Sequence, residues 1–347
     1  MLSHRLHDLP FGALQDRLAA LGHPKYRASQ IWQGMFVELA DGYRDITTLP
    51  KPLRSRLDWE LPWTSLKLAR FARAQDGDTA KALFQLEDGE MIESVFMIYP
   101  KRGTVCLSTQ VGCAMACTFC ATGLGGFVRH LASGEIVAQA CAAARWFAEH
   151  DRRLTNLVYM GMGEPLDNYD ATLDSIRILN DRRGMNLGAR SFTVSTVGIP
   201  SGIDRLAKEP LQVNLAVSLH ASNDRLRSQL VPVNRQHPIP KLMRACRRYI
   251  DSTHRRVTFE MALIREVNDS DTDARELARL LAGLLCHVNL IPLNASPSTD
   301  ADPSSGHRVK AYAAILEQHR IPVSIRDSRG SEIEAGCGQL RAKGLKP

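Results

Sequence analysis

From Thr104 onward, short apolar segments alternate with longer amphipathic ones, and this alternation constrains the fold more than any other feature of the chain. Repeated strand–helix units predict a parallel sheet joined by right-handed crossovers. The expected strands are Thr104–Ser108, Leu157–Met160, Ser191–Thr196, Val213–Leu219, Val257–Leu263, His287–Leu293 and Val323–Arg326. The expected helices are Gly134–Glu149, Tyr169–Asn180, Gly202–Ala207, Ile239–Ser252, Asp271–Leu284 and Arg308–His319.

About six strand–helix units are too few for an eight-fold barrel. We therefore expect an α/β chain with a partial (β/α)6 barrel over residues 104–347, in preference to a doubly wound sheet. Residues 1–75 contain three helical patterns and predict a small helical domain. Residues 76–103 contain two β-rich runs around Asp88-Gly89, which predict a hairpin that links the two parts.

The overall composition indicates a basic globular chain. It has 347 residues with 44 Lys and Arg against 37 Asp and Glu, and a net charge of +7 favours an anionic partner such as nucleic acid. We find neither a membrane-spanning apolar run nor a secretion signal, and eight cysteines are too few for a disulfide scaffold. A cytoplasmic location without a membrane partner is expected. Basic residues near the end of the helical domain either follow a phosphate backbone or solvate a linker: Lys51, Arg54, Arg56, Lys67, Arg70 and Arg73.

Three of the cysteines, Cys113, Cys117 and Cys120, share one loop with the spacing C-x3-C-x2-C. A structural zinc needs four ligands, and His130 is a possible fourth. An iron–sulfur cubane held by three thiolates instead leaves one iron open for a ligand. The spacing, with Phe119 before the third cysteine, resembles the signature of the radical S-adenosylmethionine (SAM) superfamily. That resemblance implies a [4Fe–4S] cluster and SAM as cofactors.

Polar residues follow several of the expected strands, where parallel strands bring their carboxyl ends together. Each of them either caps a strand end or belongs to a binding site. Glycine allows close approach of a ligand to the backbone, and a carboxylate can accept a hydrogen bond from an ammonium group. The candidates are Gly163, Glu164, Ser195, Ser218, His220 and Asn294, together with Leu219, which lies between Ser218 and His220.

The other cysteines differ in their settings. Cys141, Cys246 and Cys286 lie in or beside helical patterns and are expected to pack in the core. Cys337 lies in a glycine-rich loop near the C-terminus, and Cys106 lies on the strand before the three-cysteine loop. These two thiols are either unrelated or form a reaction pair.

Five separated motifs, in residues 106–126, 160–168, 217–221, 289–294 and 337–340, together resemble the bacterial adenine carbon-2 RNA methyltransferase family (RlmN). The resemblance covers nearly the whole chain. It implies methylation of adenosine 2503 in 23S ribosomal RNA and of adenosine 37 in tRNAs, with residues 1–75 as an accessory RNA-binding domain. By match, the three cysteines hold the cluster and the strand-end candidates listed above contact SAM. Gly336 departs from the family pattern, in which many members have alanine.

The resemblance also implies a mechanism. Carbon 2 of adenine is electron-poor, so a radical route is needed in place of polar methyl transfer. One SAM methylates Cys337, and a radical generated from a second SAM removes hydrogen from that methyl group. The carbon radical adds to adenine, Glu93 accepts the ring proton, and Cys106 releases the product by forming a disulfide with Cys337. An electron donor and a disulfide reductant are therefore implied as partners, and the target base must be unstacked.

Two alternatives to this reading stay open at the level of sequence. One is the related Cfr-type enzyme, which methylates carbon 8 of an rRNA adenine and confers antibiotic resistance. The other is a non-enzymatic iron–sulfur protein that binds RNA or senses redox state.

Overall fold

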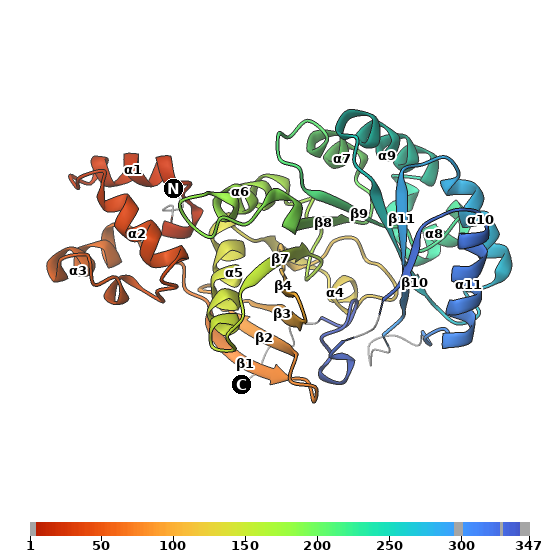
Figure 1. Cartoon of the computed structure of the whole chain (residues 1–347), viewed down its shortest axis with the longest axis horizontal. Coiled ribbons are helices and arrows are strands. Elements are labelled where there is room, and N and C mark those ends of the chain that lie inside the picture. The colour runs from red at the N-terminus through yellow and green to blue at the C-terminus, as the bar shows by residue number, and fades with distance from the viewer. Residues whose placement is uncertain (1–4, 295–300, 327–328, 341–347) are drawn as a thin grey trace.

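The computed structural model describes residues 5–294, 301–326 and 329–340 (Figure 1). The chain begins with a helical module that stands at one end of the molecule. Its core gathers apolar side chains that recur every three or four residues, as in Leu14 and Leu18 or Ile31 and Met35, all of them buried. The module consists of η1 (Leu6–Asp8), α1 (Phe11–Ala20), α2 (Arg27–Phe36), η2 (Tyr43–Asp45) and α3 (Lys51–Glu60).

A ten-stranded sheet forms the rest of the framework, in the order β1-β2-β3-β4-β7-β8-β9-β10-β11-β12. Strands β1 to β4 are antiparallel, and β4 and β7 to β12 are parallel. The two edge strands β1 and β12 do not pair, so the barrel is open, as predicted. The strands are β1 (Lys67–Arg73), β2 (Thr79–Gln85), β3 (Met91–Tyr99), β4 (Arg102–Cys106), β7 (Leu154–Tyr159), β8 (Phe192–Thr196), β9 (Asn214–Ser218), β10 (Val257–Leu263), β11 (Cys286–Pro292) and β12 (Val323–Ile325).

Helices follow the parallel strands and cover the outside of the sheet (Figure 1). They are α5 (Ser133–Ala148), α6 (Tyr169–Asn180), α7 (Pro200–Leu206), α8 (Asp224–Leu230), α9 (Ile239–Thr253), α10 (Asp271–Leu281) and α11 (Gly306–Gln318), with short turns η3 (Ala189–Ser191), η4 (Pro232–Arg235) and η5 (Ser331–Ile333). As expected, Cys141, Cys246 and Cys286 are buried in the core that these helices share with the sheet. None of the helices in the described ranges is long and apolar enough to cross a membrane.

Strand β1 was not expected from the sequence, and it lies inside the range 1–75 that we assigned to the helical domain. Its residues pair with β2, yet most of them are exposed at the edge of the sheet. The sequence pattern did not indicate a strand here because many of its residues are exposed Lys and Arg. An edge strand can form its hydrogen bonds without having an apolar face. The division of the chain at residue 75 stays a prediction.

Two of the basic residues near this boundary are occupied by the module itself. The Arg54 guanidinium donates to the carbonyl oxygens of Leu49, Arg44 and Thr47, and Arg56 pairs with Glu60 at 2.7 Å. Arg54 therefore fastens a loop of the helical module.

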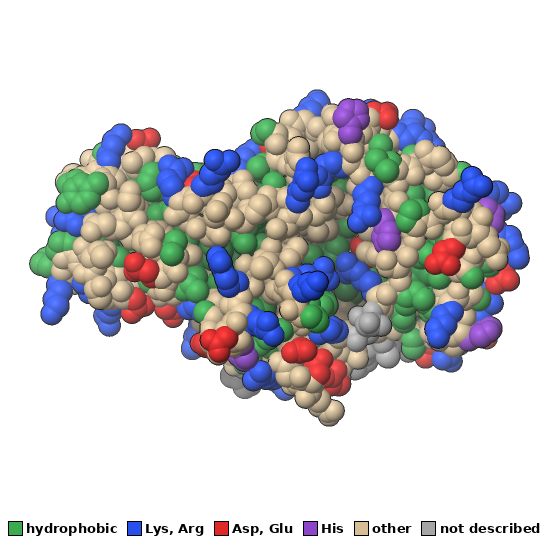
Figure 2. Space-filling view, viewed as in Figure 1, with side chains coloured by type: hydrophobic (Ala, Val, Ile, Leu, Met, Phe, Trp, Pro, Cys, Tyr) green, Lys and Arg blue, Asp and Glu red, His purple; other side chains and the backbone are tan. Residues whose placement is uncertain are grey.

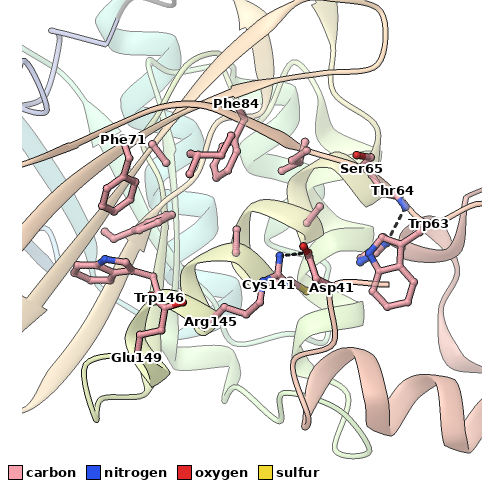
Figure 3. A pocket seen from close by; sticks show the side chains of 17 residues that line it. Asp41, Trp63, Thr64, Ser65, Phe71, Phe84, Cys141, Arg145, Trp146 and Glu149 are labelled. Atoms are coloured by element: carbon pink, nitrogen blue, oxygen red, sulfur yellow. Dashed lines mark hydrogen bonds and ion pairs between the residues drawn. The ribbon is translucent and has the colours of Figure 1, made fainter. Parts of the chain in front are cut away.

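A cavity of about 550 Å³ lies between the helical module, the first three strands and α5 (Figure 3). Arg145 of α5 reaches across it to Asp41 at 2.9 Å, and the Asp8 carboxylate accepts from the backbone N–H of Gly134 at 2.6 Å. These contacts attach the module to α5. None of the site residues predicted from the sequence lines this cavity.

Candidate active site

The loop with the three cysteines lies between β5 (Gln110–Gly112) and α4 (Ala121–Leu124), and β6 (Phe127–His130) pairs with β5. Gly112 has φ +73°, and a Cβ there would collide with the Gly126 carbonyl oxygen. Backbone hydrogen bonds hold the loop: Cys113 N–H donates to Gly126 at 2.7 Å and Thr118 N–H to Leu230 at 3.0 Å. The loop is therefore shaped mainly by backbone contacts, which leaves its thiols available.

The three thiols suit an iron–sulfur cluster. All of them are free, and burial raises the pKa of Cys113 to about 12 and raises that of Cys117 as well. The charge of Cys120 raises the pKa of both thiols further. Such thiols lose their protons when metal binds. Among the described residues, these thiols form no group that could hold a single metal ion. A cubane cluster has a different requirement, because each of the three thiolates binds a different iron atom.

His130, the possible fourth ligand of a zinc loop, is engaged elsewhere. Its Nδ1 lies 3.0 Å from Nε2 of Gln110, and the same amide group donates to Asp167 at 2.8 Å. This arrangement gives His130 a structural partner on β5.

A cavity of about 150 Å³ opens beside Cys117 and Cys120, at the carboxyl ends of the parallel strands. We call it the cluster-side cavity. It brings together six of the seven strand-end candidates with the C-terminal thiol: Gly163, Glu164, Ser195, Ser218, His220, Asn294 and Cys337. Leu219 is the exception, because its side chain is buried in the core and only its backbone faces the neighbouring strand, donating to Glu260 at 3.1 Å.

Glu164 is buried, with both carboxylate oxygens facing backbone donors. Oε1 accepts from Leu166 N–H at 3.0 Å and Oε2 from Val197 N–H at 2.8 Å. Burial outweighs these hydrogen bonds and raises the pKa of Glu164 to about 7. A cationic ligand beside it would favour the carboxylate form. The adjacent Gly163 has φ +104°, and a Cβ there would lie 2.6 Å from Gln110 Cβ.

His220 connects the strand ends to the cysteine loop. Its ring meets Phe119 edge to face with centroids 4.8 Å apart, and its Nδ1 accepts from Ala262 N–H at 3.0 Å. Burial lowers the pKa of His220 to about 3, so the ring is neutral. A neutral imidazole can both accept from the backbone and leave Nε2–H as a donor.

Arg227 supports the same region and was missed by the sequence analysis. Its guanidinium is fully buried and donates to the carbonyl oxygens of Leu219 at 3.0 Å, Ser218 at 3.2 Å and Val197. It thereby holds the ends of β8 and β9 together. Nothing in the sequence marks this arginine, because a charged residue in a short helix normally lies at the surface.

A second cavity of about 420 Å³ adjoins the first, and we call it the thiol cavity. Both Cys106 and Cys337 line it. Cys337 lines the cluster-side cavity as well and is exposed to the open space, whereas Cys106 is buried. Burial and the charge of Cys337 both raise the pKa of Cys106. The structure thus brings together two cysteines that are far apart in the sequence.

The Cys337 loop is fastened to the cluster loop. Ala121 N–H donates to the Gly338 carbonyl oxygen at 2.8 Å, and Thr122 Oγ1 donates to that of Leu340 at 2.6 Å. Asn294 Nδ2 donates to the Cys337 carbonyl at 3.2 Å. At Gly336, a Cβ would lie 2.6 Å from the Asn294 amide, so glycine at this position lets that amide pack against the backbone.

Glu93 is buried on β3 but lines neither cavity. Its carboxylate pairs with Lys81 Nζ at 3.1 Å. Lys81 also donates to the Glu334 carbonyl oxygen at 3.1 Å, three residues before Cys337. A single lysine therefore links Glu93 to the loop that carries the exposed thiol.

Glu260 on β10 is a further residue that the sequence analysis missed. Its Oε1 accepts from Asn289 at 2.9 Å, Oε2 has no hydrogen-bond partner among the described residues, and burial raises its pKa. It lines the cluster-side cavity together with Arg326. A carboxylate in the middle of an apolar strand was the available sequence signal, since such residues are seldom buried without a purpose.

Comparison with known proteins agrees with this geometry. The radical SAM superfamily model matches residues 107–278. A protein of Chloroflexus aurantiacus named "Probable dual-specificity RNA methyltransferase RlmN" is 48% identical over 353 residues, covering 99% of this chain and 94% of the relative. The chain belongs to the RlmN family of radical SAM methyltransferases.

Two further similar proteins support the same assignment. An RlmN protein of the same printed name from Geobacillus thermodenitrificans is 45% identical and covers 98% of this chain and 93% of its own. The crystal structure of a radical SAM methyltransferase from Sphaerobacter thermophilus matches with a TM-score of 0.97 and 55% identity, covering 98% of this chain and all of that one. The chain is accordingly a SAM-dependent radical methyltransferase, and its open barrel is that of the superfamily.

Proposed function

We propose that this enzyme methylates carbon 2 of adenosine 2503 in 23S ribosomal RNA and of adenosine 37 in tRNAs, through an S-methylcysteine at Cys337. The observation that carries the proposal is that Cys106 and Cys337 line one cavity, which adjoins the cluster-side cavity. The RlmN relatives are named as dual-specificity RNA methyltransferases, which supports RNA as the substrate.

In this proposal, Cys113, Cys117 and Cys120 hold a [4Fe–4S] cluster, and the six candidates in the cluster-side cavity, with the backbone of Leu219, bind SAM. When bound, the cluster and SAM supply the methyl group and the radical chemistry that carbon 2 of adenine requires. Glu164 is placed to receive a cationic group, and His220 offers a neutral donor. Arg227 keeps the strand ends in position for both residues.

Cys337 carries the methyl group, because it is the thiol that lines both cavities. Glu93 is the proposed acceptor of the proton from carbon 2 of the adenine; without RNA its carboxylate pairs with Lys81 and lines neither cavity, so it must reach the cavity when the substrate binds. After the adduct has also given up one electron, the Cys106 thiolate attacks the sulfur of Cys337 and forms a disulfide. The electron pair of the breaking carbon–sulfur bond stays on the product carbon, which takes up a proton and becomes the methyl group. A reductant must supply two electrons to the disulfide before the next turnover, and an electron donor must reduce the cluster.

All eight cysteines are free, which fits a reducing compartment, and we place the enzyme in the cytoplasm. The electron donor and the disulfide reductant are its further protein partners.

Anaerobic reconstitution with iron and sulfide, followed by incubation with methyl-labelled SAM and a 23S rRNA fragment or tRNA, tests the proposal. Nucleoside analysis should show 2-methyladenosine in both RNAs. Labelled 8-methyladenosine would instead assign the Cfr-type reaction. An RNA that stays unlabelled while SAM is cleaved would overturn the proposed substrate.

A further inference from the structure

The thiol cavity is lined by arginines and by uncharged polar side chains, and both kinds of group suit a nucleotide. Resting on the proposed function, we propose that Arg102 and Arg329, stacked on Tyr99, bind backbone phosphates of the RNA at the target nucleotide, while Thr104 hydrogen-bonds the nucleoside inside the cavity. The nucleotide would enter the cavity between the turn that joins β3 to β4 and the segment that follows β12.

The charge of the lining supports an anionic ligand. Three arginines, Arg102, Arg326 and Arg329, line the thiol cavity, and no Asp or Glu does so among its described residues. Arg102 and Arg326 form no ion pair within the described ranges, and the only acidic neighbour recorded for Arg329 is Asp78 at 3.9 Å. Figure 2 shows Lys and Arg side chains around the hollow in the middle of this face of the molecule. Such a concentration of positive charge favours phosphate.

Tyr99 holds two of these arginines in place. The Arg102 guanidinium lies 4.4 Å from the centre of its ring and that of Arg329 4.5 Å. A guanidinium stacked on a ring keeps its in-plane N–H groups free, and these suit the bidentate recognition of phosphate. One N–H group of Arg329 donates to the Ile98 carbonyl oxygen at 3.0 Å, which fixes the position of the guanidinium.

The two arginines come from parts of the sheet that are far apart in its strand order. Tyr99 ends β3 and Arg102 begins β4, whereas Arg329 follows β12. The stack therefore joins the turn between β3 and β4 to the segment after β12, and a ligand bound there would touch both of these segments.

Besides Arg326, whose charge acts on both thiols, the cavity lining carries uncharged polar side chains. Thr104 lies two residues before Cys106 on β4, so both side chains face the same side of the sheet. Its hydroxyl is buried and has no hydrogen-bond partner among the described residues. Asn156 stands opposite Thr104 in the pairing of β4 with β7 and also lines the cavity. This arrangement matches the parts of a nucleotide. The arginines would bind the phosphate, the unpaired hydroxyl would bind the nucleoside, and the thiols would lie beside the reacting carbon.

The test measures binding of a labelled RNA hairpin with the target adenosine at several salt concentrations, together with kcat and KM for methylation. Arg102→Gln and Arg329→Gln should each weaken binding about tenfold. Each should also lower the slope of log affinity against log salt by about 1. Arg247→Gln is the matched control, because Arg247 is exposed on α9, outside the cavity and outside every recorded ion pair.

Thr104→Val keeps the shape of the side chain and removes the hydroxyl. It should raise KM severalfold and leave the salt slope unchanged, which separates nucleoside contact from phosphate contact. The rate of SAM cleavage without RNA should equal that of the wild type for every variant. This control shows that the barrel and the cluster are intact.

Wild-type salt slope and KM in the double variant Arg102→Gln/Arg329→Gln would overturn the proposal. Loss of RNA-independent SAM cleavage in these variants would also overturn it, since the arginines would then serve only to hold the fold together. A wild-type enzyme that methylates no RNA would instead refute the proposed function, so the two failures are distinguishable.

Discussion

The backbone N–H of Ala121 donates to the carbonyl oxygen of Gly338 at 2.8 Å. These are the residues that directly follow Cys120 and Cys337, so a hydrogen bond joins the three-cysteine loop to the loop that carries Cys337. The two loops are more than 200 residues apart in the chain. Cluster integrity and the position of Cys337 are therefore expected to depend on each other.

Thr122→Val tests this connection. It removes the donor to the buried Leu340 carbonyl oxygen, which leaves that oxygen without its partner and should loosen the Cys337 loop. We expect slower methylation of Cys337, measured by intact-protein mass spectrometry, with unchanged iron content. Thr118→Val is the control, because the Thr118 hydroxyl on the same loop makes only a long contact of 3.5 Å to Leu230. Equal rates in both variants would argue against a role for this contact.

Alanine at Cys113, Cys117 or Cys120 should abolish iron binding and SAM cleavage, because a three-thiolate cluster has no spare protein ligand. Iron content, the visible absorption of the cluster and 5′-deoxyadenosine release measure the effect. Cys286→Ala should retain all three signals, since this buried cysteine lies outside the cavities. Normal SAM cleavage by the triple variant would exclude these residues as cluster ligands.

The two thiols of the cavity should differ in their mutant behaviour. Cys337→Ala should accept no methyl group and form no product. Cys106→Ala should still be methylated and attack adenine, but it should stall as a covalent protein–RNA adduct because the resolving thiol is missing. A nuclease-sensitive band of low mobility on a denaturing gel reveals the adduct. Ordinary turnover of Cys106→Ala without such a band would disprove the paired-thiol mechanism.

His7 should make the stability of the chain depend on pH. It is 1% exposed, its Nδ1 accepts from Thr64 N–H at 3.3 Å, and burial lowers its pKa from 6.5 to about 3. Between these pH values the unfolded chain binds a proton that the folded chain does not, so the free energy of unfolding falls as pH is lowered. At pH 5.5 we expect a loss of about 1.4 kcal/mol relative to pH 7.5.

Urea unfolding followed by tryptophan fluorescence measures this loss at the two pH values. Trp63 reports on the site, since its ring lies 5.0 Å from that of His7. His7→Gln should remove this part of the pH dependence whatever its effect on stability at pH 7.5. An unchanged difference between the two pH values in His7→Gln would show that other groups cause it.

Local patterns in the sequence were sufficient for much of this molecule. Apolar strands of matching length predicted the open parallel barrel, because burial on both faces leaves a recognisable run of residues. The spacing of Cys113, Cys117 and Cys120 predicted their shared loop. The strand-end candidates, including Glu164 and His220, were predicted to gather because parallel strands end at the same edge of a sheet.

Only the tertiary structure decided which distant groups face one another. The exposed edge strand β1, the buried Arg227 and the unpaired oxygen of Glu260 were missed, because each depends on partners that no local pattern encodes. The sequence did not decide whether Cys106 and Cys337 are related. In the folded chain, both line one cavity. They do so because the open barrel brings β4 and the C-terminal segment together, and contacts between such distant segments arise from packing rather than from the spacing of residues.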